Sequence, residues 1–388
     1  MMLPVSPTVA LPSLRAWLCS DPDPMATALA RRYGGDAGDW TRLFSRFDPD
    51  ATVACRFHYR HRGEPDRIVG IELPGPLPDR TDWRTDACRW QVFPHDPALP
   101  TLPALWASLE GARVVRYRPG HRCTFEVSTR AGRCFVKVLS GDVGGGIHAA
   151  SQLIHQASDA GDLAFLTPRP LRWVPAHAAL WQAALPGLPI TLASLAQTGA
   201  SLAARLGAAA ASLPRSGLRF PGDFTCTDQC ARTQRYVDEL ARRLPAEAAM
   251  LTSLMTRLRA AADSWSPRPL RAIHGALHLH QWLMDDARLG LVDLDRLCMG
   301  DPELDVATFI TELDYEDRAV IPLESLQTAF RTAYAQQLGE LDPTRLAWYG
   351  VHKHLAKALK CVRGVRVDAE RRAVRALARA LALAETCA

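Results

Sequence analysis

Lysine is nearly absent from this chain of 388 residues: only four of its 46 basic residues are lysine, and the others are arginine. Three of the four are Lys353, Lys357 and Lys360, so Lys137 is the only lysine in the first 352 residues. A position that keeps lysine against this bias is expected to need a compact ammonium charge. Because Lys137 lies within an apolar stretch, Cys134 to Leu139, a chance surface lysine is the poorer explanation.

Long apolar runs are also missing. No run approaches the roughly 18 residues that a membrane span requires, and the chain does not start with a charged leader before an apolar run. The ten cysteines show no framework spacing, which is typical of a reducing compartment. Cys226 and Cys230 form a lone C-x-x-x-C, so ordinary thiols are favoured over a zinc site. We therefore expect a soluble cytoplasmic protein without a membrane partner.

The chain has no strong excess of charge. Its net charge is +5, charged residues make up 22% and hydrophobic residues 48%. This composition indicates a globular protein and gives no reason to expect nucleic acid as a partner. Because single cores rarely grow beyond about 250–300 residues, we expect two or three lobes.

The pattern of apolar residues changes along the chain. Residues 1–45 are predicted to be helical, residues 51–90 to form strands, and the proline-rich stretch 90–105 to wrap the surface before a short helix. From Ala112 to Leu139 three alternating segments predict an antiparallel meander with Lys137 on its third strand. A helix over 147–157, two strands leading into Leu185-Pro186-Gly187, and long helices from Thr191 follow.

The stretch Arg271 to Phe309 is the most specific part of the sequence. It predicts a strand ending at His274-Gly275, a loop to Gln281, a hairpin turning at Asp285-Asp286-Ala287, and a helix after Asp301-Pro302. Polar loops at the ends of these strands are expected to bring His274, Gln281, Asp293 and Asp295 together. Such a cluster is typical of a metal-phosphate site.

This order of residues resembles the motif of the aminoglycoside phosphotransferase and choline kinase-like family: H-G-D-x-x-x-x-N, a hairpin, D-x-D and G-D-P-x-x-D. The resemblance covers roughly residues 110–340. The matching residues are His274, Gly275, Asp293, Asp295, Gly300, Asp301, Pro302 and Asp305.

The resemblance implies an α+β, two-lobed protein-kinase-like fold with an antiparallel β small lobe and a mostly helical large lobe. With an N-terminal α/β cap added, we predict three parts: a cap domain at 1–105, a nucleotide-binding small lobe and hinge at 106–187, and a helical large lobe with the catalytic loop and substrate site at 188–388. The residue pattern of the predicted cap does not indicate its function.

The resemblance also implies ATP and Mg²⁺ as cofactors. Lys137 would contact the phosphates, and the turn from Arg118 to Arg122 would cover them, although it lacks a full glycine-rich signature. The hinge backbone at Gln182 to Ala184 would bond the adenine. The family's lysine-pairing carboxylate has no counterpart, because no Glu occurs between Lys137 and Leu185. The remaining candidates for that pairing are Asp142, Asp159 and Asp162.

For the metal and the reaction, the resemblance implies Asp293 as the Mg²⁺ ligand and Gln281, where the family usually has Asn, as a weaker ligand. Asp295 would assist at the metal, while His274 and Asp305 would brace the loop. Asp301 and Asp305 could instead only cap the following helix. A transition-metal triad of His278, His280 and Asp293 is the less favoured alternative.

Ala276 occupies the position of the family's catalytic Asp. Alanine cannot act as a base, and losing a general base typically costs about 10²–10⁴-fold in rate. Three explanations fit: a natural pseudokinase, an active member with another base such as His278, or an alanine introduced to trap a complex. The intact remainder of the site slightly favours the third.

Only eight residues separate Asp293 from Pro302, which leaves no long activation segment to dock a protein substrate. A small molecule is therefore the expected partner. An acidic run on the next helix could face a cationic substrate and a basic C-terminal helix an anion, but solvated faces are the simpler explanation for both. The acidic residues are Glu312, Asp314, Glu316 and Asp317; the basic ones are Lys353, Lys357, Lys360, Arg363, Arg366, Arg371, Arg372, Arg375 and Arg379.

The leading hypothesis is an ATP- and Mg²⁺-dependent phosphotransferase acting on a hydroxyl of a small antibiotic or metabolite, impaired by Ala276. A nucleotide-binding pseudokinase with a regulatory or scaffolding role is the first alternative. A maltokinase-like sugar kinase, suggested by Gln281 and the N-terminal cap, is the second.

Overall fold

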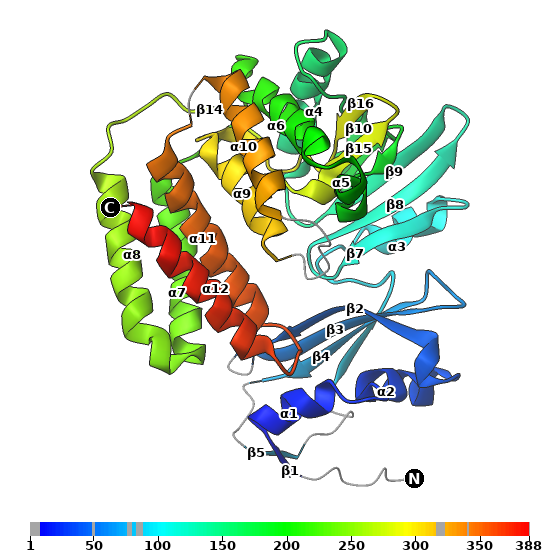
Figure 1. Cartoon of the computed structure of the whole chain (residues 1–388). Coiled ribbons are helices and arrows are strands. Elements are labelled where there is room, and N and C mark those ends of the chain that lie inside the picture. Colours follow the sequence, from blue (N-terminus) through cyan, green and yellow to red (C-terminus); the bar gives the residue numbers. More distant parts are fainter. Residues whose placement is uncertain are drawn as a thin grey trace.

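The computed structural model describes residues 8–48, 51–75, 80–82, 88–315, 323–339 and 341–387. Glu316 and Asp317 of the predicted acidic run lie outside the described residues. Figure 1 shows three groups of elements along the chain: a small sheet with two helices, a second sheet, and a large helical part. This arrangement confirms the predicted two-lobed α+β fold with an N-terminal addition. The domain boundaries themselves stay a prediction.

The N-terminal group is a four-stranded antiparallel sheet in the order β2-β3-β4-β6, with α1 and α2 lying on one of its faces (Figure 1). A further antiparallel pair, β1 and β5, lies next to α1 (Figure 1). The bounds are β1 Thr8–Ala10, α1 Leu11–Leu18, α2 Pro24–Tyr33, β2 Trp40–Phe47, β3 Val53–His61, β4 Ile68–Pro74, β5 Arg80–Asp82 and β6 Arg89–Val92.

The helical prediction for residues 1–45 is wrong at its end. Trp40 and Leu43 lie on β2, where Trp40 pairs with His61 and is buried. The helix stops earlier because Gly34 and Gly35 have φ values of 86° and 83°, in the left-handed region that glycine tolerates. A few apolar residues at loose spacing could not distinguish a helix from a strand paired by tertiary contacts.

The second sheet has five strands in the order β10-β11-β9-β8-β7, so the predicted three-stranded meander is confirmed and extended by two strands. Lys137 on β9 lies between Thr124 on β8 and Leu180 on β11. The bounds are α3 Leu102–Ser108, β7 Arg113–Arg118, β8 Arg122–Thr129, β9 Gly132–Leu139, α4 Gly144–Asp159, β10 Pro170–Val174 and β11 Ala179–Ala183.

The C-terminal group is mostly helical, with short strands that carry the motif residues. Its helices are α5 Leu192–Thr198, α6 Ala200–Arg215, α7 Cys226–Arg243, α8 Ala248–Asp263, α9 Glu303–Leu313, α10 Leu323–Leu338, α11 Pro343–Val362 and α12 Ala369–Ala384. Its strands are β12 Leu188–Pro189, β13 Asp223–Phe224, β14 Arg271–Ile273, β15 Trp282–Asp285, β16 Arg288–Leu291 and β17 Cys298–Gly300. The predicted single C-terminal helix is thus two helices, α11 and α12, lying side by side (Figure 1).

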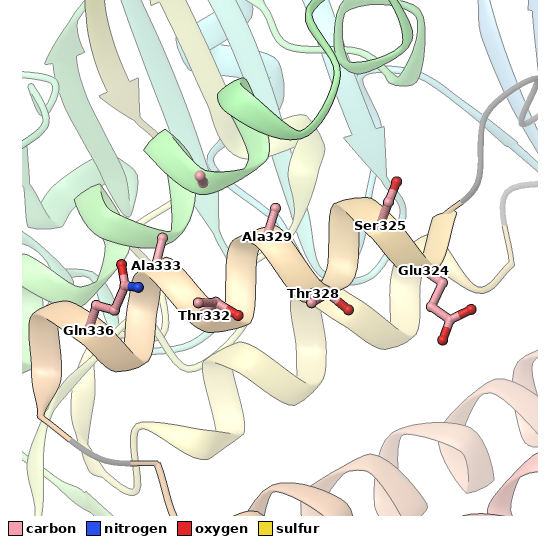
Figure 2. A pocket seen from close by; sticks show the side chains of 8 residues that line it. Glu324, Ser325, Thr328, Ala329, Thr332, Ala333 and Gln336 are labelled. Atoms are coloured by element: carbon pink, nitrogen blue, oxygen red, sulfur yellow. The ribbon is translucent and has the colours of Figure 1, made fainter.

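Helices α6 and α10 pack closely at Gly207, where an added Cβ would lie 2.1 Å from the Phe330 carbonyl oxygen. A cavity of about 630 Å³ opens beside this contact, and Figure 2 shows its lining on α10. Short side chains such as Thr328, Ala329 and Thr332 make up most of that lining. None of the predicted site residues lines it, so this cavity is separate from the motif.

The N-terminal sheet contacts both other groups. The Phe47 amide donates to the Arg363 carbonyl oxygen over 2.8 Å, and Arg243 pairs with Asp48 over 2.6 Å. On the other side, Arg60 donates to the Val114 carbonyl oxygen on β7. Among the residues that the structure describes, no helix combines the length and apolar character needed to cross a bilayer.

Candidate functional site

Four charged side chains from the two lobes meet at the end of the β15–β16 hairpin. Lys137 Nζ lies 3.2 Å from Asp293 Oδ1 and 2.6 Å from Asp295 Oδ1. Arg122 Nη1 lies 3.3 Å from Asp293 Oδ1 and 2.7 Å from Asp295 Oδ2. We call these four residues the ion cluster. The structure therefore brings together the isolated lysine and the D-x-D that the sequence singled out.

Burial alone would raise the pKa of Asp293, but the charges of Lys137 and Arg122 outweigh it and hold that pKa well below its ordinary value. Asp293 also has a φ of 64°, an uncommon conformation for a residue other than glycine. The Asp293 carboxylate is thus ionised at neutral pH and held in place by two cations.

The predicted partners of Lys137 are wrong. Asp142, Asp159 and Asp162 make no hydrogen bond or ion pair with it among the described residues, and its carboxylate partners are the two of the D-x-D. Local sequence could not reveal this, because Asp293 follows Lys137 by 156 positions and the contact depends on how the lobes pack.

Asp305 holds the loop that carries Ala276. Its carboxylate accepts hydrogen bonds from the His274 amide at 2.6 Å and the Gly275 amide at 2.9 Å. Gly275 has a φ of 75°, and an added Cβ would lie 2.4 Å from the Arg296 carbonyl oxygen, so only glycine fits there. The bracing role predicted for Asp305 agrees with these bonds, whereas the capping alternative is wrong, since no side chain caps the start of α9.

Asp301 is not a helix cap either. Its buried carboxylate accepts from Arg268 Nε at 2.9 Å, Arg345 Nη1 at 3.1 Å and Tyr349 Oη at 2.9 Å. Burial would raise the pKa of Asp301, but Arg268 and its other partners lower it below the usual range. Asp301 therefore joins α9 and α11 to the segment before β14.

The remaining loop residues are tied to one another. The side-chain oxygen of buried Gln281 accepts from the His278 amide at 2.7 Å, and its carbonyl oxygen accepts from the Val292 amide at 3.0 Å. His274 Nε2 lies 3.3 Å from the Val292 carbonyl oxygen. No contact between Gln281 and Asp293 is found in the described residues, so a ligand role for Gln281 stays a prediction.

The predicted hinge continues β11. Gln182 pairs with Phe135. The Ala184 amide donates to the Arg133 carbonyl oxygen at 2.9 Å, so of the two main-chain groups of Ala184 only the carbonyl remains for a ligand. The next amide, that of Leu185, has no hydrogen-bond partner among the described residues. Leu185 lies where the predicted hinge ends, but only the register of the sheet shows that its amide, and not that of Ala184, is unused.

Asp96, in the N-terminal proline-rich stretch, holds the turn between β7 and β8. Its carboxylate accepts from the Gly120 amide at 2.8 Å and from Tyr117 Oη at 2.9 Å. Arg118 and Arg122, predicted to lie over the phosphates, flank this turn. The segment between β6 and α3 thus fixes the β7–β8 turn, and no pattern in the sequence indicated this contact.

On the other side of the loop, His278 and His280 stack with ring centroids 5.3 Å apart, and His278 Nδ1 lies 3.8 Å from Glu312 Oε1. Burial lowers the pKa of His278 to about 4, so its ring is neutral at pH 7. Glu312, the first acid of the predicted run, also pairs with Lys357 at 2.8 Å. Its charge is thus largely compensated.

The donor set fits a magnesium ion better than a transition metal. Within the described ranges, no group of three or more His, Cys, Asp or Glu side chains is arranged to hold a metal, so the His278, His280 and Asp293 triad finds no support. Mg²⁺ commonly takes one or two carboxylates with phosphates and water, and Asp293 and Asp295 offer that number.

Comparison with known families gives one clear match. The sequence model of a family described as "Phosphotransferase enzyme family" matches residues 115–349, which is more than half of the chain. No curated protein sequence matches.

Solved structures show the same fold at low sequence identity. A choline/ethanolamine kinase family protein from Mesorhizobium loti has 20% identity and a TM-score of 0.53, covering 74% of this chain and 96% of that one. Amicoumacin kinase hAmiN in complex with AMP-PNP, Ca²⁺ and Ami has 14% identity and a TM-score of 0.54, covering 72% and 92%. A thermostable mutant of the aminoglycoside phosphotransferase APH(4)-Ia, in ternary complex with ADP and hygromycin B, has 16% identity and a TM-score of 0.53, covering 75% and 98%.

Proposed function

This chain belongs to the phosphotransferase enzyme family, and from that premise we propose that it binds ATP with Mg²⁺ and transfers the γ-phosphate to a hydroxyl of a small molecule. The observation that carries the proposal is the ion cluster, in which Lys137 and Arg122 face Asp293 and Asp295. The solved kinases of similar fold are described with small-molecule acceptors, and two of them hold adenine nucleotides.

In the proposed reaction, Lys137 and Arg122 exchange a carboxylate for phosphate oxygens when the nucleotide binds. Such cations stabilise the negative charge that spreads over the transferred group. We propose that the Ala184 carbonyl and the Leu185 amide bond the adenine edge; the lack of a protein partner for the Leu185 amide among the described residues supports this. Asp293, assisted by Asp295, would hold Mg²⁺, which supplies charge neutralisation between the phosphates.

The transfer itself needs little covalent work from the protein. The acceptor oxygen bonds to the γ-phosphorus, the bond between that phosphorus and the bridging oxygen breaks, ADP leaves, and the hydroxyl proton passes to a base or to water. Ala276 cannot take that proton. We therefore propose that His274, Gly275 and Asp305 still shape the loop, while proton removal is the impaired step in this chain.

Nucleotide binding tests the proposal directly. We expect ATP to bind in the presence of Mg²⁺ as measured by calorimetry, and Lys137→Ala to weaken binding about tenfold or more because charge-assisted hydrogen bonds are lost. Arg130→Gln is the matched control, since Arg130 is exposed at the far end of β8 from Arg122. Absence of ATP binding to the unmodified chain would rule out the proposal.

The contact between Asp96 and the β7–β8 turn leads to a second expectation. Asp96→Ala removes the acceptor of the Gly120 amide and of Tyr117 Oη, so the turn over the phosphates should loosen and the Kd for ATP should rise about three- to tenfold. Calorimetry with Asp96→Ala and Asp96→Asn measures this, with circular dichroism as a check on folding. An unchanged Kd in both variants would show that Asp96 does not position the turn for nucleotide binding.

A nucleotide-binding pseudokinase is the second candidate, and Ala276 is the observation that favours it. It predicts ATP binding without turnover in the unmodified chain and also in Ala276→Asp. A maltokinase-like sugar kinase remains a prediction from the sequence, and a panel of sugars as acceptors tests it.

A further inference from the structure

Resting on the proposed function, we propose that Asp295 is a positioning residue, which holds Lys137 and Arg122 in place for the phosphates and is not itself a ligand of the metal ion. The two carboxylates of the D-x-D would thus have different tasks. Asp293 would bind the metal ion, and Asp295 would keep the two cations in a fixed orientation while they contact the nucleotide.

The two carboxylates contact the cations differently. Each oxygen of Asp295 takes one cation: Oδ1 lies 2.6 Å from Lys137 Nζ, and Oδ2 lies 2.7 Å from Arg122 Nη1. Asp293 offers one oxygen, Oδ1, to both cations, at the longer distances of 3.2 Å and 3.3 Å. Short charge-assisted bonds to separate oxygens fix two side chains more firmly than longer bonds to a shared oxygen. Asp295 is therefore the main anchor of both cations.

Strand geometry explains why the two cations need an anchor. Lys137 on β9 lies opposite Thr124 on β8, and Arg122 comes two positions before Thr124. Because side chains alternate along a strand, Lys137 and Arg122 project from the same face of the sheet as diagonal neighbours, roughly 7–8 Å apart. Two positive charges at this spacing repel each other, and neither can hold the other in place. The Asp295 carboxylate compensates the repulsion and connects the two side chains.

Burial makes a fixed partner necessary for Lys137. The Lys137 side chain is 9% exposed and that of Asp295 is 16% exposed. A buried ammonium group without a counter-charge is costly, and the flexible stem of lysine would leave the position of Nζ undefined. The aspartates that follow Lys137 in the small lobe make no contact with it among the described residues, so the large lobe supplies the carboxylate.

The oxygen that remains for a metal ion belongs to Asp293. Its Oδ2 atom has no hydrogen bond or ion pair within the described part of the chain, whereas both oxygens of Asp295 are engaged. The Asp293 side chain is also the more exposed of the two, at 29% against 16%. A single carboxylate is enough for Mg²⁺ where phosphates and water complete the coordination. Asp293 can therefore be the metal ligand while Asp295 keeps both cations.

On nucleotide binding, Lys137 and Arg122 would give up their longer contacts with Asp293 and keep their shorter contacts with Asp295. Lysine has three N–H donors and arginine five, so both side chains retain donors for phosphate oxygens. Because Asp295 has already set their orientation, the ligand does not have to order two long side chains. Asp295 would assist at the metal only indirectly, by keeping the two cations on the phosphates.

Calorimetry with AMP-PNP on the full chain separates the two tasks when each titration is made once with EDTA and once with Mg²⁺. Asp295→Asn should weaken binding about three- to tenfold in both titrations, since the ligand must then order both cations. The ratio of the two Kd values should stay that of the unmodified chain. Asp293→Asn removes the same charge and is the matched control. It should bind AMP-PNP with EDTA at least as tightly as the unmodified chain, but lose the strengthening by Mg²⁺.

The order of the Lys137 side chain can be measured by NMR, because the chain has only four lysines. In a chain whose lysines carry ¹³C at Cε, the signal that disappears in Lys137→Arg belongs to Lys137. At saturation with AMP-PNP, its two ε protons should differ in chemical shift in the unmodified chain and in Asp293→Asn, because the side chain is fixed. They should become equivalent in Asp295→Asn and differ again in Asp295→Glu, which keeps a carboxylate for the cations.

The outcomes distinguish this inference from the proposed function. If AMP-PNP does not bind to the unmodified chain, the proposed function fails and the positioning role fails with it. If Asp295→Asn loses the strengthening by Mg²⁺ as Asp293→Asn does, Asp295 is a metal ligand, so the inference is wrong while the proposed function stands. Inequivalent ε protons of Lys137 in Asp295→Asn would also overturn it. Circular dichroism checks folding, and Arg130→Gln should leave every measurement unchanged.

Discussion

Ala276→Asp is expected to raise the rate of phosphate transfer about 10²–10⁴-fold, because it restores a general base at the loop that follows β14. The loop around position 276 is held in shape, because Asp305 accepts from the His274 and Gly275 amides and the ion cluster joins the two lobes. Ala276 is only partly buried, so a carboxylate can be accommodated there. Release of ADP, measured with a panel of neutral, cationic and anionic alcohols, gives the rate.

Ala276→Asn is the matched control. Its side chain has nearly the same shape as aspartate but cannot accept the proton as a base, so we expect ATP affinity like that of the aspartate variant and no increase in turnover. Equal turnover in the two variants would show that a base at this position is not the missing function. Strong turnover by the unmodified chain, lost in His278→Gln, would instead identify His278 as the base.

The second large effect concerns stability. Asp301→Ala is expected to lower the free energy of unfolding of the helical part by about 3–5 kcal/mol, because it removes the buried carboxylate that accepts from Arg345 and Tyr349 and leaves the buried guanidinium of Arg345 only its longer pair with Asp342 at 3.5 Å. Arg345 also lies over the Trp265 ring, which contacts Trp348. Urea unfolding followed by tryptophan fluorescence therefore measures the change close to the site of substitution.

The same carboxylate predicts a pH dependence. The pKa of Asp301 in the folded chain is below its unfolded value of about 3.9, so its contribution to stability is complete above that value and is lost as the pH falls toward the folded pKa. We expect the free energy of unfolding to decrease on acidification below about pH 5, and to decrease less steeply in Asp301→Asn.

Asp285→Asn is the control for both measurements, because Asp285 and Arg288 form an exposed pair at the hairpin end. Such pairs contribute about 0–1 kcal/mol, so the variant should unfold almost like the unmodified chain. If Asp301→Ala were no less stable than Asp285→Asn, the buried ion pairs of Asp301 would have no stabilising role.

Much of the fold could be predicted from local patterns. The alternating segments from Ala112 to Leu139 are β7, β8 and β9, and the hairpin and helix between Trp282 and Leu313 lie where turn residues and Pro302 indicated them. The prediction was wrong around Trp40, because glycine ended the helix and pairing with β3 decided the rest. Residue spacing determines elements, but it does not determine which element pairs with which.

The features of the candidate site can also be separated into those that the sequence determined and those that depend on tertiary packing. The sequence by itself determined the isolated Lys137, the D-x-D, the family motif and the alanine at position 276. Only the tertiary structure decided that Lys137 pairs with Asp293 and Asp295, and that Asp96 holds the turn at Gly120. The physical reason is that ion pairs and buried charges depend on distances between side chains far apart in the sequence, which only the packing of the two lobes and the N-terminal sheet fixes.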